Sequence, residues 1–172
     1  MKRNKLNTNQ NLFACIDASA THYLQISFIS TDVLVIYDSL CPSTNSLVTS
    51  QVFRDTSAWF HVVVYYNTTE STASDKAKIY VNGQEITQFS TDERSSLTSD
   101  SSINRAEQHS IGSRLPFTGG AGAFYGDFTL ADIHFIDGQA LTPSSFGFPH
   151  SNGCRQPKPF TGSYRPHPFH LS

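Results

Sequence analysis

Short runs of alternating apolar and polar residues dominate the chain, and they predict β-strands rather than helices. Residues 23–29 alternate, with apolar side chains on one face, and residues 33–37 are almost wholly apolar, as in a strand covered on both sides. The strongest segments are residues 59–67, with apolar or aromatic side chains on both faces, and residues 128–136, where apolar side chains again occupy alternate positions. Shorter candidates are residues 12–16, 47–53 and 109–113. The pattern favours an all-β fold, an antiparallel β-sandwich of roughly eight strands.

The clearest turn is Asn82-Gly83, within the stretch KIYVNGQEI. Asn-Gly between β-branched and aromatic residues is the strongest short hairpin signal, because both residues of a type I′ turn need positive φ. This turn pairs Val81 with Gln84. It also pairs Ile79 with Ile86, so the apolar side chains of the hairpin share one face. We therefore expect the hairpin to be scaffold that brings two strands into register.

Composition divides the chain into three parts. Residues 1–11 are polar and predict a flexible arm, residues 12–147 hold the predicted strands, and residues 148–172 form a proline-rich tail that we expect to be extended or disordered. Within the middle part, residues 91–108 are rich in Ser, Thr and Asp and predict a long loop. Residues 142–147 predict one helical turn, with Thr as N-cap and Pro at the first helical position.

Charge and cysteine content narrow the expected partners. The formal net charge is −2 and no basic stripe is present, so we expect no nucleic-acid partner. No apolar run approaches about 18 residues, which predicts no membrane span. The three cysteines form an odd, sparse set and predict reduced thiols. A single Cys15–Cys41 bridge is the alternative and would need an oxidising compartment.

Two strand sequences resemble a known superfamily. WFHVVV at residues 59–64, followed by IYVNG at residues 79–83, is similar to the concanavalin A-like lectin/glucanase superfamily, which includes laminin G-like and pentraxin-like domains. Residues 109–112 and 124–133 loosely resemble the strands that follow.

A narrower resemblance is carried by QVFRD at residues 51–55 and FIDGQALTPSSFG at residues 135–147. These stretches look like lectin-like domains in virion and tail proteins of marine phages. The resemblance covers roughly residues 23–164.

The resemblance implies a concanavalin A-like jelly roll that recognises carbohydrate without catalysis. The expected partner is host surface polysaccharide, and the expected location is a phage particle. The family's W-[ST]-x-S-x-W-[VIF] strand has no match here, which predicts a sandwich missing terminal strands. Open edges of that kind favour a homo-oligomer.

Two alternatives stay open. The first is a structural virion protein that docks onto other capsid or tail subunits and binds no sugar. The second is an extracellular laminin G-like adhesion domain, for which Asn67-Thr68-Thr69 would be a glycosylation sequon.

The sequence predicts no enzyme. Glycoside hydrolases of the superfamily carry an E-x-D-x-x-E strand that supplies two carboxylates to one cleft. No glutamate of this chain begins E-x-D, and no G-x-S-x-G nucleophile elbow is present.

Candidate ligand residues lie on the predicted loops. Sugar binding needs exposed aromatic faces beside amide and charged groups, and the candidates are Asn104, Arg105, His109 and Tyr125. The resemblance also suggests calcium as a possible cofactor, because related domains often bind it through loop oxygens. The candidates for calcium are Asp32, Asp100 and Asn104.

Two further residues are expected to be structural. Trp59 opens a predicted central strand, so it should pack in the core or at its rim rather than stack on sugar. Arg54-Asp55 should form a turn with an ion pair.

Overall fold

Antiparallel β-structure makes up most of the regular structure, as the alternating pattern predicts. The computed structural model describes residues 1–17, 22–39, 45–98, 101–114, 124–151 and 155–164. The largest sheet has six strands in the order β10-β2-β3-β4-β5-β9, all neighbours antiparallel. Its strands are β2 (Gln10–Ile16), β3 (Tyr23–Phe28), β4 (Val33–Asp38), β5 (Asn45–Val52), β9 (Phe89–Asp92) and β10 (Gln108–Ile111).

A three-stranded sheet and two strand pairs complete the β-structure of the described part. The three-stranded sheet has the order β6-β7-β8, with β6 (Val62–Tyr66), β7 (Ala77–Val81) and β8 (Gln84–Glu85). The pairs are β1 (Lys2–Arg3) with β11 (Phe128–Thr129), and β12 (Gly147–Pro149) with β13 (Arg155–Pro157). The short helical elements are α1 (Ala73–Lys76), η1 (Arg94–Ser96) and η2 (Pro143–Ser145).

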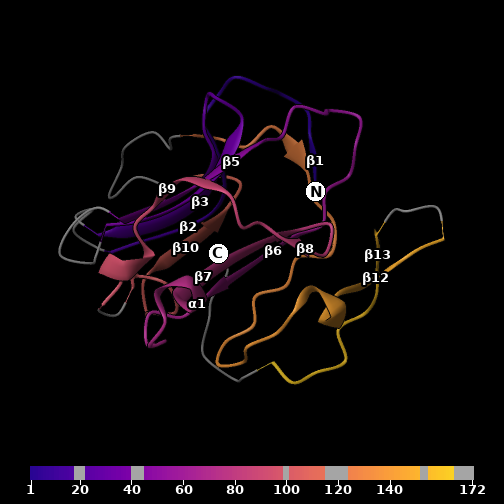
Figure 1. Cartoon of the computed structure of the whole chain (residues 1–172). Helices are drawn as coiled ribbons and strands as arrows, with labels where there is room; N and C mark the ends of the chain where they lie inside the picture. Colours follow the sequence, from indigo (N-terminus) through magenta and orange to yellow (C-terminus); the bar gives the residue numbers. More distant parts are fainter. Residues whose placement is uncertain (18–21, 40–44, 99–100, 115–123, 152–154, 165–172) are drawn as a thin grey trace.

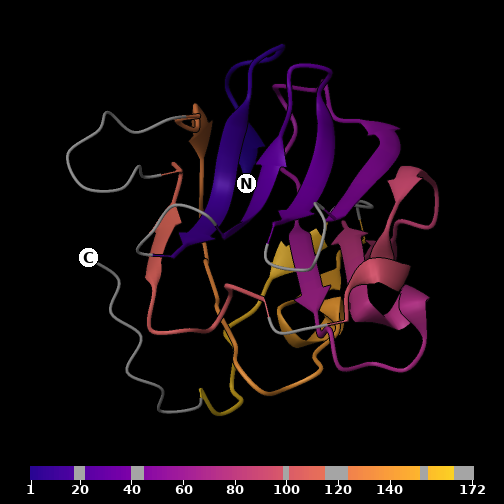
Figure 2. The ribbon, with the colours of Figure 1, turned by 90° about the vertical axis from the view of Figure 1, so that its left-hand side faces the viewer.

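The hydrophobic core joins the two larger sheets. Figure 1 shows the six-stranded sheet and the three-stranded sheet as separate layers, and the turned view in Figure 2 agrees. Apolar side chains of both layers form one buried cluster with Phe53, which follows β5, and Leu97, which follows η1. The members from the sheets are Phe28, Leu34, Ile36, Leu47, Ala77, Ile79 and Val81. Burial of such surface is the main driving force for folding. The sequence prediction of an all-β, antiparallel protein is confirmed at this level.

The Asn82-Gly83 hairpin forms with the predicted register. Both turn residues have positive φ, 52° and 84°. Val81 lies opposite Gln84, and the Ile86 N–H donates to the Ile79 carbonyl. The guanidinium of Arg155 rests on Gly83, where any Cβ would meet it. The turn therefore also supports the C-terminal segment.

The N-terminal residues are not a free arm, contrary to the prediction. Arg3 and Asp32 are both fully buried, and the Arg3 Nη2 lies 3.0 Å from an Asp32 carboxylate oxygen. Arg54 donates its Nε to the other oxygen of Asp32 at 3.0 Å, and the Asn7 N–H donates to Asp32 at 2.8 Å. Polar composition suggested a solvated segment, but a buried carboxylate satisfies these donors. Arg54 therefore pairs with remote Asp32, whereas the Asp55 carboxylate accepts hydrogen bonds from Ser57 and Ala58.

Two predictions for aromatic strands were wrong in detail. Trp59 precedes β6 and is 54% exposed, so it does not pack in the core. The strand predicted over residues 128–136 is reduced to β11, because Asp132 has a φ of 53° that interrupts an extended backbone. Neighbouring side chains still point in different directions. Phe135 stacks on Phe13, and His134 stacks on Phe146.

The region expected to be a proline-rich tail is partly paired. β12 and β13 form an antiparallel pair, and the rings of Phe160 and Tyr164 pack around His134. Aromatic side chains hold these residues in place despite the prolines. Residues 165–172 lie outside the described part of the chain.

Cys15 is a free, buried thiol, so the alternative Cys15–Cys41 bridge does not form. Burial raises the pKa of Cys15 to about 12. A thiol with this pKa stays protonated and unreactive at neutral pH. Cys41 and Cys154 fall outside the described residues.

Candidate functional site

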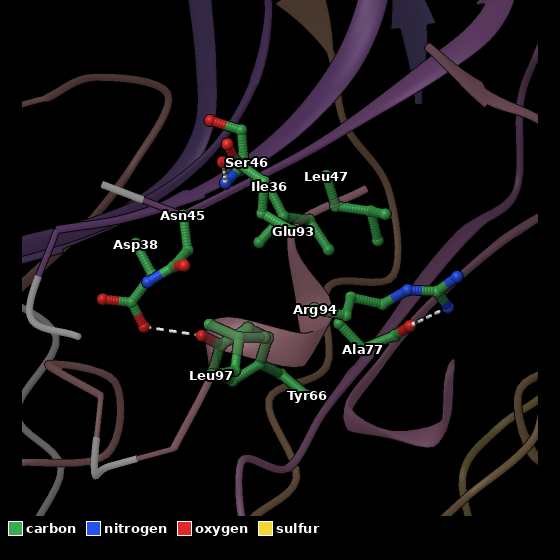
Figure 3. A pocket seen from close by; sticks show the side chains of 10 residues that line it. All are labelled: Ile36, Asp38, Asn45, Ser46, Leu47, Tyr66, Ala77, Glu93, Arg94 and Leu97. Atoms are coloured by element: carbon green, nitrogen blue, oxygen red, sulfur yellow. Dashed lines mark hydrogen bonds between the residues drawn. The ribbon is translucent and has the colours of Figure 1, made fainter. Parts of the chain in front are cut away.

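A small cavity between the two sheets is too narrow to hold a ligand. It has a volume of about 10 Å³, which is the size of one water molecule. Figure 3 shows its side chains bonded across it: the Tyr66 hydroxyl donates to Asp38 at 2.6 Å, and Arg94 donates to the Ala77 carbonyl at 3.0 Å. Hydrogen bonds at this cavity therefore connect the six-stranded sheet and η1 to the three-stranded sheet.

A larger open hollow lies where the N-terminal segment meets the segment before β11. Its volume is about 620 Å³, within the range of small-molecule binding sites. It is lined by Lys5, residues 7–10, residues 124–127 and Ser30. We call it the Tyr125 hollow, because Tyr125 is its most exposed aromatic side chain, at 63%.

Hydrogen bonds hold the N-terminal wall of the Tyr125 hollow in place. The Asn7 N–H donates to buried Asp32, and the Ser30 N–H donates to the Asn9 side chain at 2.9 Å. Gln10 then enters β2. The same buried carboxylate that orders the N-terminus thereby orders this wall.

Close packing holds the opposite wall. The Asn11 N–H donates to the Phe124 carbonyl, and the Gly126 N–H donates to the Gly112 carbonyl at 2.7 Å. Any side chain at position 126 would overlap the ring of Phe128, so only glycine fits there. Tyr125 is therefore presented from a backbone that is fixed on both sides.

The lining of the Tyr125 hollow combines the groups that recognise hydroxyl-rich ligands. Two aromatic side chains, Phe124 and Tyr125, offer apolar faces. The amides of residues 7, 9 and 10 and the hydroxyls of Thr8 and Ser30 offer hydrogen bonds. Lys5 and Asp127 place one charge of each sign at the hollow. Such a lining can stack against an apolar ring face while it binds the polar edge.

The four residues predicted for sugar binding do not form one site. Tyr125 lines the hollow, next to Gly126, which bonds to Gly112 beyond the end of β10. Asn104 and Arg105 precede the other end of β10 and are exposed. A strand rises about 3.3 Å per residue, so the length of β10 separates the two groups.

His109 is a structural residue, which corrects its prediction as a sugar ligand. It is only 4% exposed, and its ring contacts Phe13 and Phe135. Its Nδ1 donates to the Glu107 carbonyl at 2.8 Å, and its Nε2 accepts the Asn104 N–H at 3.3 Å. Because a carbonyl can only accept, the ring is the neutral Nδ1–H form. Burial lowers the pKa of His109, against the smaller opposing effect of Glu107.

We predict that stability falls between pH 7 and pH 5, and that His109 accounts for part of the fall. An unfolded histidine binds a proton near pH 6.5, whereas the pKa of folded His109 lies lower. Its stabilising contribution is therefore present above about pH 6.5 and is lost as the pH falls through the folded value. Urea unfolding of wild type and His109→Gln at several pH values measures how steeply the free energy of unfolding changes with pH.

His61 supplies the comparison for this experiment. Burial lowers the pKa of His61, helped by the positive charges of Arg155, the N-terminal amine and His134. His61→Gln should remove another part of the pH dependence of the free energy of unfolding. The double variant should remove both parts. If His109→Gln showed the same pH dependence of the free energy of unfolding as wild type, the imidazole of His109 would not be held neutral in the folded protein.

The residues predicted for calcium are not brought together. Asp32 follows β3, and its carboxylate already accepts three N–H donors. Asn104 lies at the other end of the sheet and donates its side-chain amide to Asp137 at 2.7 Å. Asp100 lies outside the described residues. Within the part that is described, no three His, Cys, Asp or Glu side chains gather closely enough to hold a metal ion.

Sequence reasoning missed the N-terminal wall of the Tyr125 hollow. Residues 5–10, KLNTNQ, have no apolar periodicity and read as an exposed arm. The only local signal was their amide content, which suits turns and ligand contacts equally well.

Comparisons with family models, with curated proteins and with solved structures each found no match. In the part of the chain that the structure describes, no helix has the length and apolar character needed to cross a membrane.

Proposed function

We propose that this protein is a non-catalytic carbohydrate-recognition module that binds glycans in the Tyr125 hollow. The observation that carries the proposal is the exposed ring of Tyr125 beside amide and hydroxyl groups in a hollow of about 620 Å³. The sequence resemblance to phage lectin-like domains supports a virion location and a host surface polysaccharide as the ligand. It also supports a concanavalin A-like sandwich as the fold. The mixed charges at the hollow favour a neutral or weakly charged sugar over a strongly acidic one.

Tyr125→Ala should weaken glycan binding about tenfold, which corresponds to about 1.4 kcal/mol. The truncation removes an aromatic face that packs against the ring of a sugar, while the exposed position leaves the fold intact. A glycan array that includes bacterial surface polysaccharides identifies a ligand, and calorimetry with that ligand gives the affinities.

Two variants control this experiment. Tyr125→Phe keeps the aromatic face and should bind nearly as well as the wild type. Trp59→Ala removes an equally exposed ring outside the hollow and should leave glycan affinity unchanged. Equal binding by Tyr125→Ala and the wild type would exclude the Tyr125 hollow as the site.

A purely structural virion protein is the second candidate, and exposed apolar side chains favour it. Trp59, Ile133 and Phe148 are each about half exposed, which suits a surface that another subunit covers. Under this alternative, Trp59→Ala would weaken association measured by sedimentation, and no glycan would bind the folded wild type.

A further inference from the structure

A buried glutamine at the base of the Tyr125 hollow has an unused hydrogen-bond acceptor. Gln10 lines the hollow but is only 1% exposed. Its Oε1 is buried and meets no hydrogen-bond donor. A buried acceptor without a partner costs roughly 1–3 kcal/mol, so a donor supplied by a ligand would stabilise this one.

The orientation of this amide is fixed by its other end. The Gln10 Nε2 donates to the Lys5 carbonyl at 3.3 Å and to the Thr8 hydroxyl at 3.1 Å. The Lys5 carbonyl can only accept, so the nitrogen must face it and the oxygen must face away. Oε1 is thus held as an acceptor before any ligand arrives.

One residue of the rim, Phe124, has a strained backbone. Asn7 and Phe124 both line the hollow with left-handed φ values, 56° and 57°. Asparagine adopts this conformation readily, whereas for a bulky aromatic residue it is uncommon and costs roughly 1–2 kcal/mol. Strained backbone of this kind is concentrated in segments that grip a ligand, where the backbone can relax when the ligand binds. Because Gln10 lines the hollow beside these residues, we expect a small shift of the rim to expose its Oε1 to a ligand.

We propose that Gln10 is the specificity-determining residue of the Tyr125 hollow and accepts a hydrogen bond from one hydroxyl or amide N–H of the sugar. This inference rests on the proposed function and narrows it. The ligand must carry a donor group that reaches below the ring stacked on Tyr125. A site built around a buried acceptor rejects an analogue that lacks the donor, because the acceptor then stays unpaired.

The test measures binding of methyl glucoside, methyl galactoside and methyl mannoside, each with its monodeoxy derivatives. Affinities come from NMR titration of wild type, Gln10→Met and Ser30→Ala. For the sugar that binds, wild type should lose about tenfold in affinity when one particular hydroxyl is removed. Gln10→Met should bind the parent and that deoxy sugar equally. Ser30→Ala, which removes a different hydroxyl from the lining, should keep the discrimination.

A second measurement covers the case in which Gln10→Met does not fold. The side-chain amide signal of wild-type Gln10, whose nitrogen stays bonded to Lys5 and Thr8, should shift on titration with the parent sugar and stay in place with the deoxy sugar. The inference is overturned if Gln10→Met still binds the parent sugar more tightly than the deoxy sugar, or if Ser30→Ala loses that difference instead. In either case the glycan-binding function stands. If wild type binds none of these sugars and none on the array, the proposed function fails and this inference fails with it.

Discussion

Asp32→Ala is expected to destabilise the protein by about 3–5 kcal/mol, the range found when one member of a buried ion pair is removed. The change leaves the fully buried guanidinium of Arg3 without a counter-charge. It also removes the acceptor of the Asn7 N–H. Urea unfolding followed by far-UV circular dichroism measures the loss, and part of the β-structure at the N-terminus should disappear first.

Arg54→Met is the matched control for this prediction. Arg54 bonds to the same carboxylate, but its side chain is 58% exposed, so removing it should cost under about 1 kcal/mol. Equal costs for Asp32→Ala and Arg54→Met would contradict the role given to buried Arg3.

Acid should have a related effect through the same carboxylate. Burial alone would raise the pKa of Asp32, but hydrogen bonds from Asn7, Arg54 and Arg3 outweigh it and hold the pKa below the ordinary value. The stabilising contribution is thus present above about pH 4 and is lost as the pH falls through the lower folded value.

Phe53→Ala is the second large expected loss, about 3–5 kcal/mol. Phe53 is fully buried and makes edge-to-face contacts with Phe28 and Phe60, with ring centroids 5.6 and 5.9 Å away. Its carbonyl accepts a hydrogen bond from Arg3 at 2.6 Å. The truncation leaves a cavity within the aromatic cluster, and thermal unfolding should shift down by roughly 10 °C.

The neighbouring residue provides the control. Val52 is exposed, so Val52→Ala should change the free energy of unfolding by no more than about 0.5 kcal/mol. If Phe53→Ala were as mild as Val52→Ala, the core would lie elsewhere than between the two larger sheets.

Local signals in the sequence were enough to predict the hairpin and most strands. Asn82-Gly83 determines its own turn geometry, and the alternation in residues 23–29 follows from one buried face. The role of Arg3 could not be predicted in this way. Its burial depends on Asp32, which is remote in sequence, and nothing near Arg3 signals such a partner.

Candidate ligand residues were predicted less well for the same reason. Tyr125 could be selected by its type and its Gly-rich surroundings, and the structure places it in the hollow. For His109 the sequence offers only the residue type, whereas its burial is set by Phe13 and Phe135, which are distant in sequence. No local signal indicates Gln10, because its unused acceptor arises only from tertiary packing. Trp59 opens a predicted strand and is of a type that is usually buried, but such a tendency does not determine the exposure of one position.

The pairing of Lys2 with Thr129 has a consequence for synthesis of the chain. A ribosome adds about 5–20 residues per second, so residue 2 waits roughly 6–25 s for residue 129 to be made. Asp32 is available to Arg3 much earlier, which can shield the cationic strand during that interval. The two walls of the Tyr125 hollow come from the residues that adjoin these two strands. The nascent chain therefore acquires its proposed ligand site only after residue 127 has been translated.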